Sequence, residues 1–207
     1  MLIKDLELYI VKRKGAIHIG GHEGEECEWY YRLNFSKVLW FEPCVESFKK
    51  LKQNMSRYNN QMAVNLGVHD SLKTAILHTA SNDGESSSIL NLGTHKIHHP
   101  KIHYIGEERI DLVRMDRFLN HKLLKGFNFL NVDVQGVELN VIKSFGKLIN
   151  NFDYIYTEIN EEELYEGGCL VGEIDSYLSM FGFERTLTKM TQFKWGDALY
   201  IKNNGNI

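Results

Sequence analysis

Short apolar runs alternate with longer amphipathic stretches along most of this chain. The apolar runs are continuous, as expected for strands buried on both faces of a parallel sheet, and the stretches between them show helical spacing. Strands are expected at residues 16–19, 37–41, 62–68, 127–134 and 154–159, and helices at 25–33, 45–55, 137–145 and 170–181. This alternation predicts βα units in a three-layered α/β fold.

The two ends of the chain depart from this alternation. Apolar residues near helical spacing, among them Leu6 and Ile10, predict a short amphipathic helix within residues 1–14. Near the other end, the apolar runs 183–190 and 197–203 lie too close together for a crossover helix, so they should pair antiparallel. A parallel sheet that closes in this way is typical of Rossmann-like methyltransferases, an analogy of fold only.

Composition favours one domain and excludes several classes of protein. With 207 residues, 43% of them hydrophobic and only two prolines, the chain is expected to form a single domain over residues 1–207. Its net charge of -3 lacks the basic footprint of a nucleic-acid-binding domain, so no nucleic-acid partner is expected. Three widely spaced cysteines favour a reducing compartment. Without a membrane span or signal peptide, a cytoplasmic location is expected, and no oligomeric state is predicted.

A glycine-rich turn follows the first predicted strand. Gly20, Gly21 and Gly24 lie before the next helix, where glycine lets the backbone approach a ligand closely. Glu42 ends the second strand, where an acidic side chain can accept both hydroxyls of a ribose. Together they indicate a ligand that contains adenosine; a plain strand-to-helix turn and a Glu42 that only stabilises a helix start are the alternatives. The G-x-G-x-x-G pattern is broken, which disfavours an NAD-dependent oxidoreductase.

Five segments resemble the FkbM-type S-adenosylmethionine-dependent methyltransferases over roughly residues 15–202: AIHIGGHEGEE, LWFEPCVESFKKL, SNDGESSSIL, IDLVRMDRFL and FNFLNVDVQGVELNVIKSFG. The most specific feature is the spacing of Asp133, Gly136 and Glu138, in a segment where the family typically reads LKIDVEGAELEVLKG. The resemblance implies a Rossmann-like class I methyltransferase fold, with a mostly parallel seven-stranded sheet, helices on both faces and an antiparallel C-terminal strand. It also implies O-methylation of a hydroxyl, most often on a sugar, natural product or glycan.

The resemblance places the cofactor at the strand ends around the glycine turn. The residues expected to contact S-adenosylmethionine are His18, Gly20, Gly21, Gly24, Glu42, His69, Ser87 and Asp133. The chain departs from the family at His18 and His69, where members usually carry Asp, and at His22, where they carry Asn. Because imidazole offers no permanent negative charge at pH 7, a catalytically silent module that binds an adenosine cofactor is the main alternative function.

Methyl transfer to a hydroxyl needs aligned reactants and a group that removes the hydroxyl proton. Asp133 and Glu158 end the fourth and fifth strands at the edge where α/β sheets bind ligands, and Glu138 lies on the following helix. These three are the expected catalytic residues, with Asp133 as the leading base and helix capping as the alternative role for Glu138. Asp133, Glu158 and Asn160 also form an oxygen set that suits Mg²⁺ or Mn²⁺, but a metal-free mechanism is favoured narrowly.

A long polar segment, residues 80–104, interrupts the βα alternation. It contains three consecutive serines and four histidines, and loops of this length within a domain are commonly functional. We expect an insertion on the acceptor side, with a plain solvated loop as the alternative; a zinc site on its histidines is disfavoured because Pro100 interrupts the helix they would need. The acceptor is expected to be a hydroxylated small molecule or glycan, contacted by Asn160, Tyr165, His95 and His99.

Overall fold

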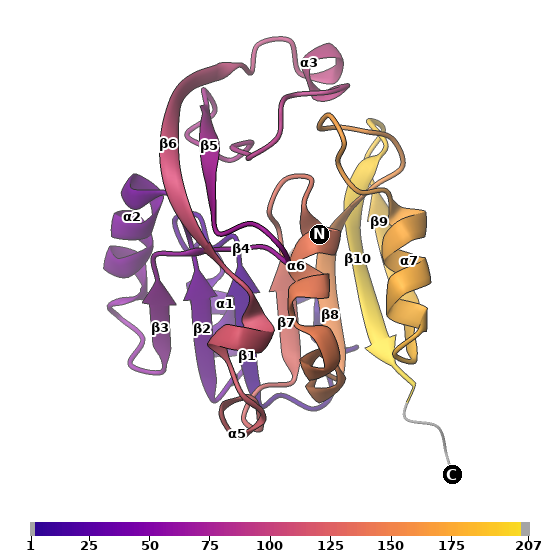
Figure 1. Cartoon of the computed structure of the whole chain (residues 1–207). Coiled ribbons are helices and arrows are strands. Elements are labelled where there is room, and N and C mark those ends of the chain that lie inside the picture. The colour runs from indigo at the N-terminus through magenta and orange to yellow at the C-terminus, as the bar shows by residue number, and fades with distance from the viewer. Residues whose placement is uncertain (1–2, 204–207) are drawn as a thin grey trace.

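A seven-stranded sheet forms the centre of the computed structural model, which describes residues 3–203 (Figure 1). Its strands are β1 (Gly15–Ile19), β2 (Lys37–Phe41), β3 (Gln61–Val64), β7 (Phe129–Val132), β8 (Tyr154–Asn160), β9 (Phe183–Met190) and β10 (Trp195–Lys202). The strand order is β3-β2-β1-β7-β8-β10-β9. The first five strands in this order pair in parallel, and β10 runs antiparallel to both β8 and β9. The expected antiparallel C-terminal pair is confirmed.

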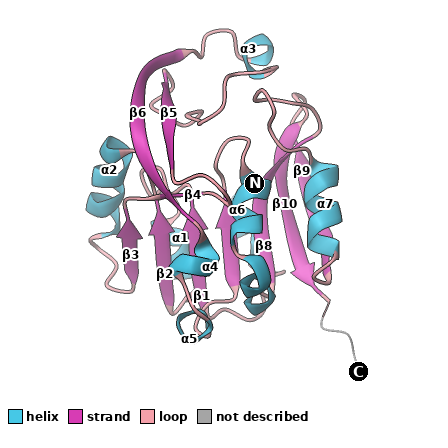
Figure 2. Cartoon of the chain, viewed as in Figure 1, coloured by secondary structure: helices cyan, strands magenta, loops and turns pink. Residues whose placement is uncertain are grey.

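Helices cover both faces of this sheet (Figure 2). They are α1 (Cys27–Arg32), α2 (Val45–Met55), α4 (Met115–Phe118), α5 (His121–Leu124), α6 (Glu138–Ser144), α7 (Val171–Ser179) and the 3-10 helices η1 (Ile3–Leu6) and η2 (Gly146–Asn151). One buried apolar cluster joins the strands to η1, α1 and α2, and a second joins them to α4, α5, α6, α7 and η2. Ala16 and Ile17 belong to different clusters because successive strand residues point to opposite faces.

A second sheet stands above the carboxyl ends of the main sheet (Figure 1). It consists of β4 (Gly67–Val68), β5 (Thr74–Ala80) and β6 (Tyr104–Val113), in the order β4-β6-β5, with β5 and β6 antiparallel. The prediction of one strand over 62–68 followed by a polar region is therefore wrong. The hairpin escaped notice because one face of β6 is solvated and its segment YIGEERIDLV carries charged residues at alternating and adjacent positions.

Two further expectations at the periphery are corrected or refined. The N-terminal segment forms only a single 3-10 turn, η1, although Ile3, Leu6 and Ile10 are buried as their spacing suggested. A helix this short gains too few hydrogen bonds to offset its nucleation, and residues 1–2 lie outside the described part. The expected insertion 80–104 is the connection between β5 and β6, and it contains the short helix α3 (His95–His98). Within residues 3–203, no helix is long and apolar enough to cross a membrane.

Candidate active site

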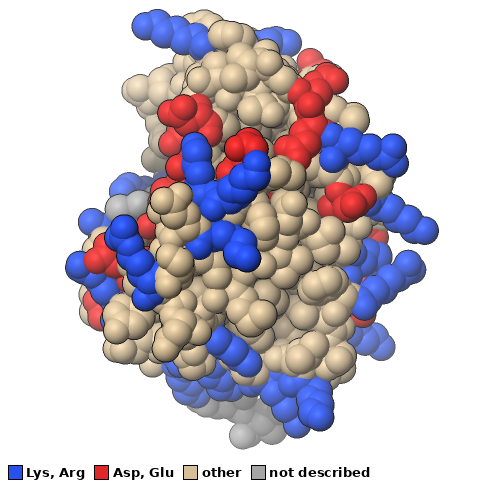
Figure 3. All heavy atoms as spheres, turned by 90° about the vertical axis from the view of Figure 1, so that its left-hand side faces the viewer, with Lys and Arg blue, Asp and Glu red and all other residues tan. Residues whose placement is uncertain are grey.

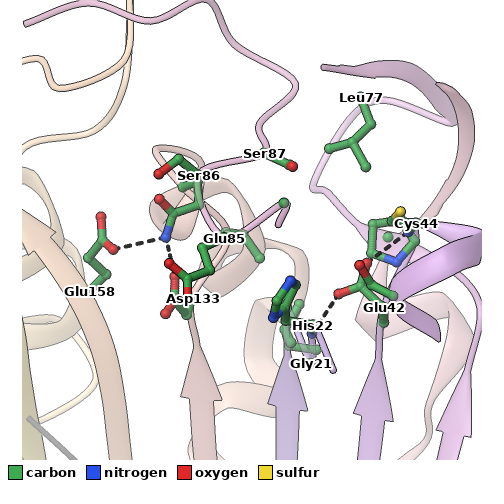
Figure 4. Close-up of a pocket in the computed structure, with 18 of the residues that line it drawn as sticks. Gly21, His22, Glu42, Cys44, Leu77, Glu85, Ser86, Ser87, Asp133 and Glu158 are labelled. Atoms are coloured by element: carbon green, nitrogen blue, oxygen red, sulfur yellow. Dashed lines mark hydrogen bonds between the residues drawn. The ribbon is translucent and has the colours of Figure 1, made fainter. Parts of the chain in front are cut away.

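A cavity of about 510 Å³ lies at the carboxyl ends of β1, β2, β7 and β8, and the β5–β6 hairpin supplies its other wall (Figure 4). Of the residues expected at the site, the cavity brings together His18, Gly20, Gly21, Glu42, Ser87, His95, His99, Asp133 and Glu158. The expected site residues outside its lining are Gly24, His69, Glu138, Asn160 and Tyr165. The glycine turn after β1 and the carboxyl ends of β2, β7 and β8 therefore meet at one cavity.

The turn after β1 requires glycine at one position. Gly20 has a φ of +86°, and a Cβ there would lie 1.7 Å from the carbonyl oxygen of Asp133. The N–H groups of Gly20 and Gly21 donate to the last carbonyl of β2 at 2.9 and 3.0 Å. The turn therefore holds β1 against both neighbouring strands and leaves a floor without side chains for a ligand. Gly24 instead faces α2, where a Cβ would lie 2.6 Å from Leu51.

Glu42 holds this turn from the end of β2. Its buried carboxylate accepts the backbone N–H groups of His22 and Cys44, both at 2.8 Å (Figure 4). Burial raises the pKa of Glu42 to about 7, although these two donors oppose the rise. Each carboxylate oxygen can still accept a further hydrogen bond. Glu42 can therefore shape the turn and also accept hydroxyls from a ligand.

Of the two histidines in the first strand and its turn, one is neutral and the other is positively charged at neutral pH. His18 is buried with its ring stacked on Trp40, 4.4 Å between centroids, and burial lowers its pKa to about 3. His22 Nδ1 lies 2.7 Å from Glu25 Oε1, and its Nε2 lies 3.0 Å from the carbonyl oxygen of Asp83. Burial opposes a charge on His22, but these acceptors raise its pKa to about 9. His18 is therefore neutral, and the charge of His22 is paired with Glu25.

Gln135 joins the two carboxylates at the ends of β7 and β8. Its amide nitrogen donates to Asp133 Oδ1 at 2.5 Å and to Glu158 Oε2 at 3.0 Å (Figure 4). Its carbonyl accepts the Tyr165 hydroxyl at 2.6 Å. Glu158 is buried, whereas Asp133 opens onto the cavity and is exposed there. Enclosure by protein and the charge of Glu138 raise the pKa of Asp133; burial and the charge of Asp133 raise that of Glu158. Two acids that resist ionisation therefore lie side by side.

Glu138 is turned away from the cavity. Its fully buried carboxylate accepts the N–H of Val134 at 3.2 Å, the N–H of Gly136 at 3.0 Å and the thiol of Cys169 at 3.4 Å. These contacts brace the tight loop between β7 and α6. They differ from the capping role considered as the alternative, because both N–H donors precede the helix. The geometry favours a structural role for Glu138 over the expected catalytic role.

We expect Glu138→Ala to lower the free energy of unfolding by about 2–4 kcal/mol, because the buried N–H of Gly136 loses its acceptor. Urea denaturation followed by circular dichroism measures this change. Glu173→Ala is a matched control, since Glu173 accepts the Leu170 N–H at 2.9 Å at the exposed start of α7. That change should cost about 1 kcal/mol or less. A Glu138→Ala protein as stable as the parent would contradict the bracing role.

His69, Asn160 and Tyr165 lie outside the cavity lining, and Asn160 and Tyr165 contact residues that belong to it. His69 Nδ1 accepts two backbone N–H groups of the turn after β4, both at 3.2 Å, and so shapes that turn. The Asn160 amide lies 3.4 Å from Glu158 Oε1, and the Tyr165 hydroxyl holds Gln135. The geometry therefore favours positioning roles for these three residues over direct contact with cofactor or acceptor.

The serine and histidine segment closes the cavity on the other side. His95 is buried, with its Nε2 3.1 Å from Ser86 Oγ, and burial lowers its pKa to about 4, so the ring is neutral. Ser87 Oγ accepts the Ala80 N–H at 3.1 Å and lines the cavity, as does His99. Contacts of Ser87 with the cofactor and of His95 and His99 with an acceptor stay predictions.

Several lining residues escaped the sequence analysis. They are the acidic residues Glu25, Glu26 and Glu85, the bridging Gln135, and the apolar residues Leu77, Ile110 and Leu112 of the hairpin and its end. Glu25 and Glu26 directly follow the glycine turn, and Gln135 lies between Asp133 and Gly136, so their position was an available signal. The apolar residues gave no local signal, because the hairpin that carries them comes to the cavity only through tertiary pairing.

The methyltransferase FkbM domain model matches residues 18–185. The chain belongs to the FkbM methyltransferase family. A curated relative of this FkbM family member, 2-O-methyltransferase NoeI of Sinorhizobium fredii, is 24% identical over 158 residues, which are 73% of this chain and 65% of NoeI. The match therefore spans just under two thirds of the length of NoeI.

Solved structures share the fold of this FkbM family member at low sequence identity. One is the ribosomal protein L11 methylase of Lactobacillus delbrueckii, with 11% identity, 97% of this chain and 77% of that chain covered, and a TM-score of 0.54. Another is a SAM-dependent methyltransferase of Aquifex aeolicus, with 10% identity, 96% of this chain and 87% of that chain covered, and a TM-score of 0.53. Sp1610 of Streptococcus pneumoniae, a candidate tRNA (m1A22) methyltransferase, was solved with S-adenosyl-L-methionine. It has 9% identity, with 100% of this chain and 76% of that chain covered, and a TM-score of 0.56. Family and fold together confirm the expected class I methyltransferase fold. Because this fold serves diverse acceptors, the expectation against a nucleic-acid partner stays a prediction.

A metal ion fits this FkbM site poorly. Among residues 3–203, no group of three or more His, Cys, Asp or Glu side chains is arranged to hold a metal. The oxygen set expected for Mg²⁺ or Mn²⁺ was Asp133, Glu158 and Asn160, but the Gln135 amide donates to both carboxylates. A shared cation would have to displace this N–H donor.

Proposed function

We propose that this FkbM family member transfers a methyl group from S-adenosylmethionine to a hydroxyl oxygen of a sugar or glycan. The main support is the arrangement of Asp133, Gln135 and Glu158 at the carboxyl edge of the sheet. The Gln135 amide joins the two acids, and Asp133 opens onto the cavity. The relative NoeI is named a 2-O-methyltransferase, which supports oxygen as the methylated atom and a polyhydroxylated acceptor. A hydroxylated small molecule other than a sugar is the alternative acceptor, because the same base would serve it.

The cavity fits the cofactor by shape and by charge. The floor at Gly20 and Gly21 admits a close approach, and Glu42 offers paired oxygens for the ribose hydroxyls. The apolar side chains of Leu77, Ile110 and Leu112 provide a wall for a flat base. When bound, S-adenosylmethionine supplies an electrophilic methyl group on a positively charged sulfur. His18 contributes a neutral wall to this site, so its departure from the family's aspartate removes one negative charge.

Asp133 is the residue placed to accept the acceptor's hydroxyl proton. Its raised pKa makes it a stronger base than an ordinary aspartate, and the ionised fraction remains substantial near neutral pH. Gln135 orients the carboxylate through its amide, and Tyr165 fixes Gln135 in turn. Glu158 receives the other amide hydrogen, so it holds the bridge rather than competing for the proton. The chain's own contribution is thus a base positioned at the edge of the cavity.

A catalytically silent cofactor-binding module is the competing function, motivated by His18 and His22. Calorimetric titration with S-adenosylmethionine, its demethylated product and NAD tests binding, and label transfer from methyl-labelled cofactor to a panel of free sugars and oligosaccharides tests turnover. Binding of the first two ligands with transfer to a sugar supports the proposal. Binding without transfer to sugar or non-sugar hydroxyl compounds favours the silent module, and binding of NAD alone contradicts both.

We expect Glu42→Ala to weaken S-adenosylmethionine binding at least about tenfold, because it removes charge-assisted hydrogen bonds to the ribose and an acceptor for the His22 N–H. Isothermal titration calorimetry measures the dissociation constant. The control Glu46→Ala removes an exposed carboxylate on α2 that pairs with Lys49 at 2.6 Å. A folded Glu42→Ala protein with parental affinity would show that the ribose lies elsewhere.

A further inference from the structure

Acidic side chains outnumber basic ones in the lining of the cavity. Its lining includes the carboxylates of Glu25, Glu26, Glu42, Glu85, Asp133 and Glu158, and no lysine or arginine among the described residues lines it. His22 supplies one positive charge, which is paired with Glu25. The outer surface differs, since the face in Figure 3 shows lysines and arginines mixed with acidic residues. An acidic lining favours a cationic ligand over an anionic one.

Two of these carboxylates, those of Glu26 and Asp133, follow the neighbouring strands β1 and β7. Glu26 precedes α1, directly after the glycine turn, and Asp133 follows β7, the parallel neighbour of β1. Both side chains line the cavity. Burial raises the pKa of Glu26 to about 7, and the charges of Glu25 and Asp133 add to the rise. Gly20, which opens the turn that leads to Glu26, packs against the Asp133 carbonyl oxygen, so the two carboxylates reach the cavity from adjoining backbone. A ligand cation placed beside both would be attracted by both.

We propose that Glu26 and Asp133 discriminate by charge between the two forms of the cofactor, binding the sulfonium form in preference to the neutral thioether that remains after methyl transfer. This inference rests on the proposed function and adds a residue, Glu26, that has no part in the proton transfer. The two ligands share their ammonium, carboxylate, ribose and adenine groups. They differ only by one methyl group and its positive charge, so their affinity ratio isolates the effect of that charge.

Charge discrimination would promote release of the used cofactor. In the reaction the methyl group passes from sulfur to the hydroxyl oxygen, the bonding electrons stay on sulfur, and the hydroxyl proton passes to the Asp133 carboxylate. Positive sulfur and negative Asp133 are therefore neutralised in the same reaction. Because Asp133 is exposed in the cavity, solvent weakens the attraction, and we expect a preference of about tenfold for the sulfonium form.

Calorimetry at pH 8 tests the inference, because Glu26 and Asp133 are then ionised despite their raised pKa values. S-adenosylmethionine and S-adenosylhomocysteine are titrated into the parent and into Glu26→Gln, Asp133→Asn and Glu28→Gln. The last is a matched control: Glu28 lies on α1 two residues from Glu26, faces solvent and pairs with Arg32 at 2.6 Å. Each of the first two variants should reduce the preference about threefold or more, mainly by weakening the sulfonium ligand, and the control should keep the parental ratio.

The possible results separate this inference from the proposed function. Equal affinities in the parent overturn charge discrimination and leave the methyltransferase assignment intact, whether or not any variant folds. A parental preference that persists in folded Glu26→Gln and Asp133→Asn proteins also overturns it, because other groups must then act. If neither ligand binds the parent, the proposed function itself fails.

Discussion

Replacing Asp133 by asparagine should lower kcat about a hundredfold or more, the typical loss when a general base is removed. Asparagine keeps the shape of the side chain, and its carbonyl can still accept the Gln135 amide, so the fold should survive. Label transfer to a verified acceptor measures kcat, and circular dichroism checks folding. Asp111→Asn is a suitable control because Asp111 is exposed on β6 outside the cavity lining.

The pH profile of the parent should show the same ionisation. Only ionised Asp133 can accept a proton, and its raised pKa moves this ionisation above the usual range of aspartate. The kcat/KM value should therefore rise with pH and level off above about pH 8. Full turnover by Asp133→Asn would exclude Asp133 as base, and the histidines at 95 and 99 would become the next candidates.

Chelation separates the base from a metal-dependent alternative. Because the Gln135 amide donates to both carboxylates, activity should survive EDTA. If EDTA silenced the enzyme and Mg²⁺ or Mn²⁺ restored it, Asp133 and Glu158 would instead hold an ion that lowers the pKa of the acceptor hydroxyl.

Gly20→Ala is expected to lower the free energy of unfolding by at least about 3 kcal/mol and to abolish measurable cofactor binding. The new Cβ would lie 1.7 Å from the Asp133 carbonyl oxygen, a backbone atom that can move only if β1 and β7 separate. The φ of +86° adds strain for any residue with a side chain. Urea denaturation and calorimetry measure the two effects.

Gly172→Ala provides the matched control for this substitution. Gly172 lies in α7, and a Cβ there would meet nothing within 4 Å. Alanine should therefore raise stability by about 0.5–1 kcal/mol through its better helix propensity, without affecting cofactor binding. A Gly20→Ala protein that behaved like Gly172→Ala would show that the turn is not built as described.

Local pattern predicted most of the main sheet, because its strands are buried on both faces and read as continuous apolar runs. The β5–β6 hairpin was missed for the opposite reason. Leu77 and Ile110 face inward, but the opposite face of the hairpin is solvated, so its composition resembles that of a loop. The register that brings Leu77 opposite Glu108 joins residues far apart in sequence, and no local rule specifies such a pairing.

By itself, the sequence determined which strand ends form the site, because parallel strands deliver their carboxyl ends to one edge and Gly20, Glu42, Asp133 and Glu158 each end or follow a strand. The direction of each side chain was decided only by tertiary structure. After β7 the chain turns through positive φ at Gln135 and Gly136, which sends Glu138 into the loop and leaves Asp133 facing the cavity. Gln135 became the bridge because β8 places Glu158 within 3.0 Å of its amide. Such contacts depend on how separate segments pack together, and neither spacing nor composition records that geometry.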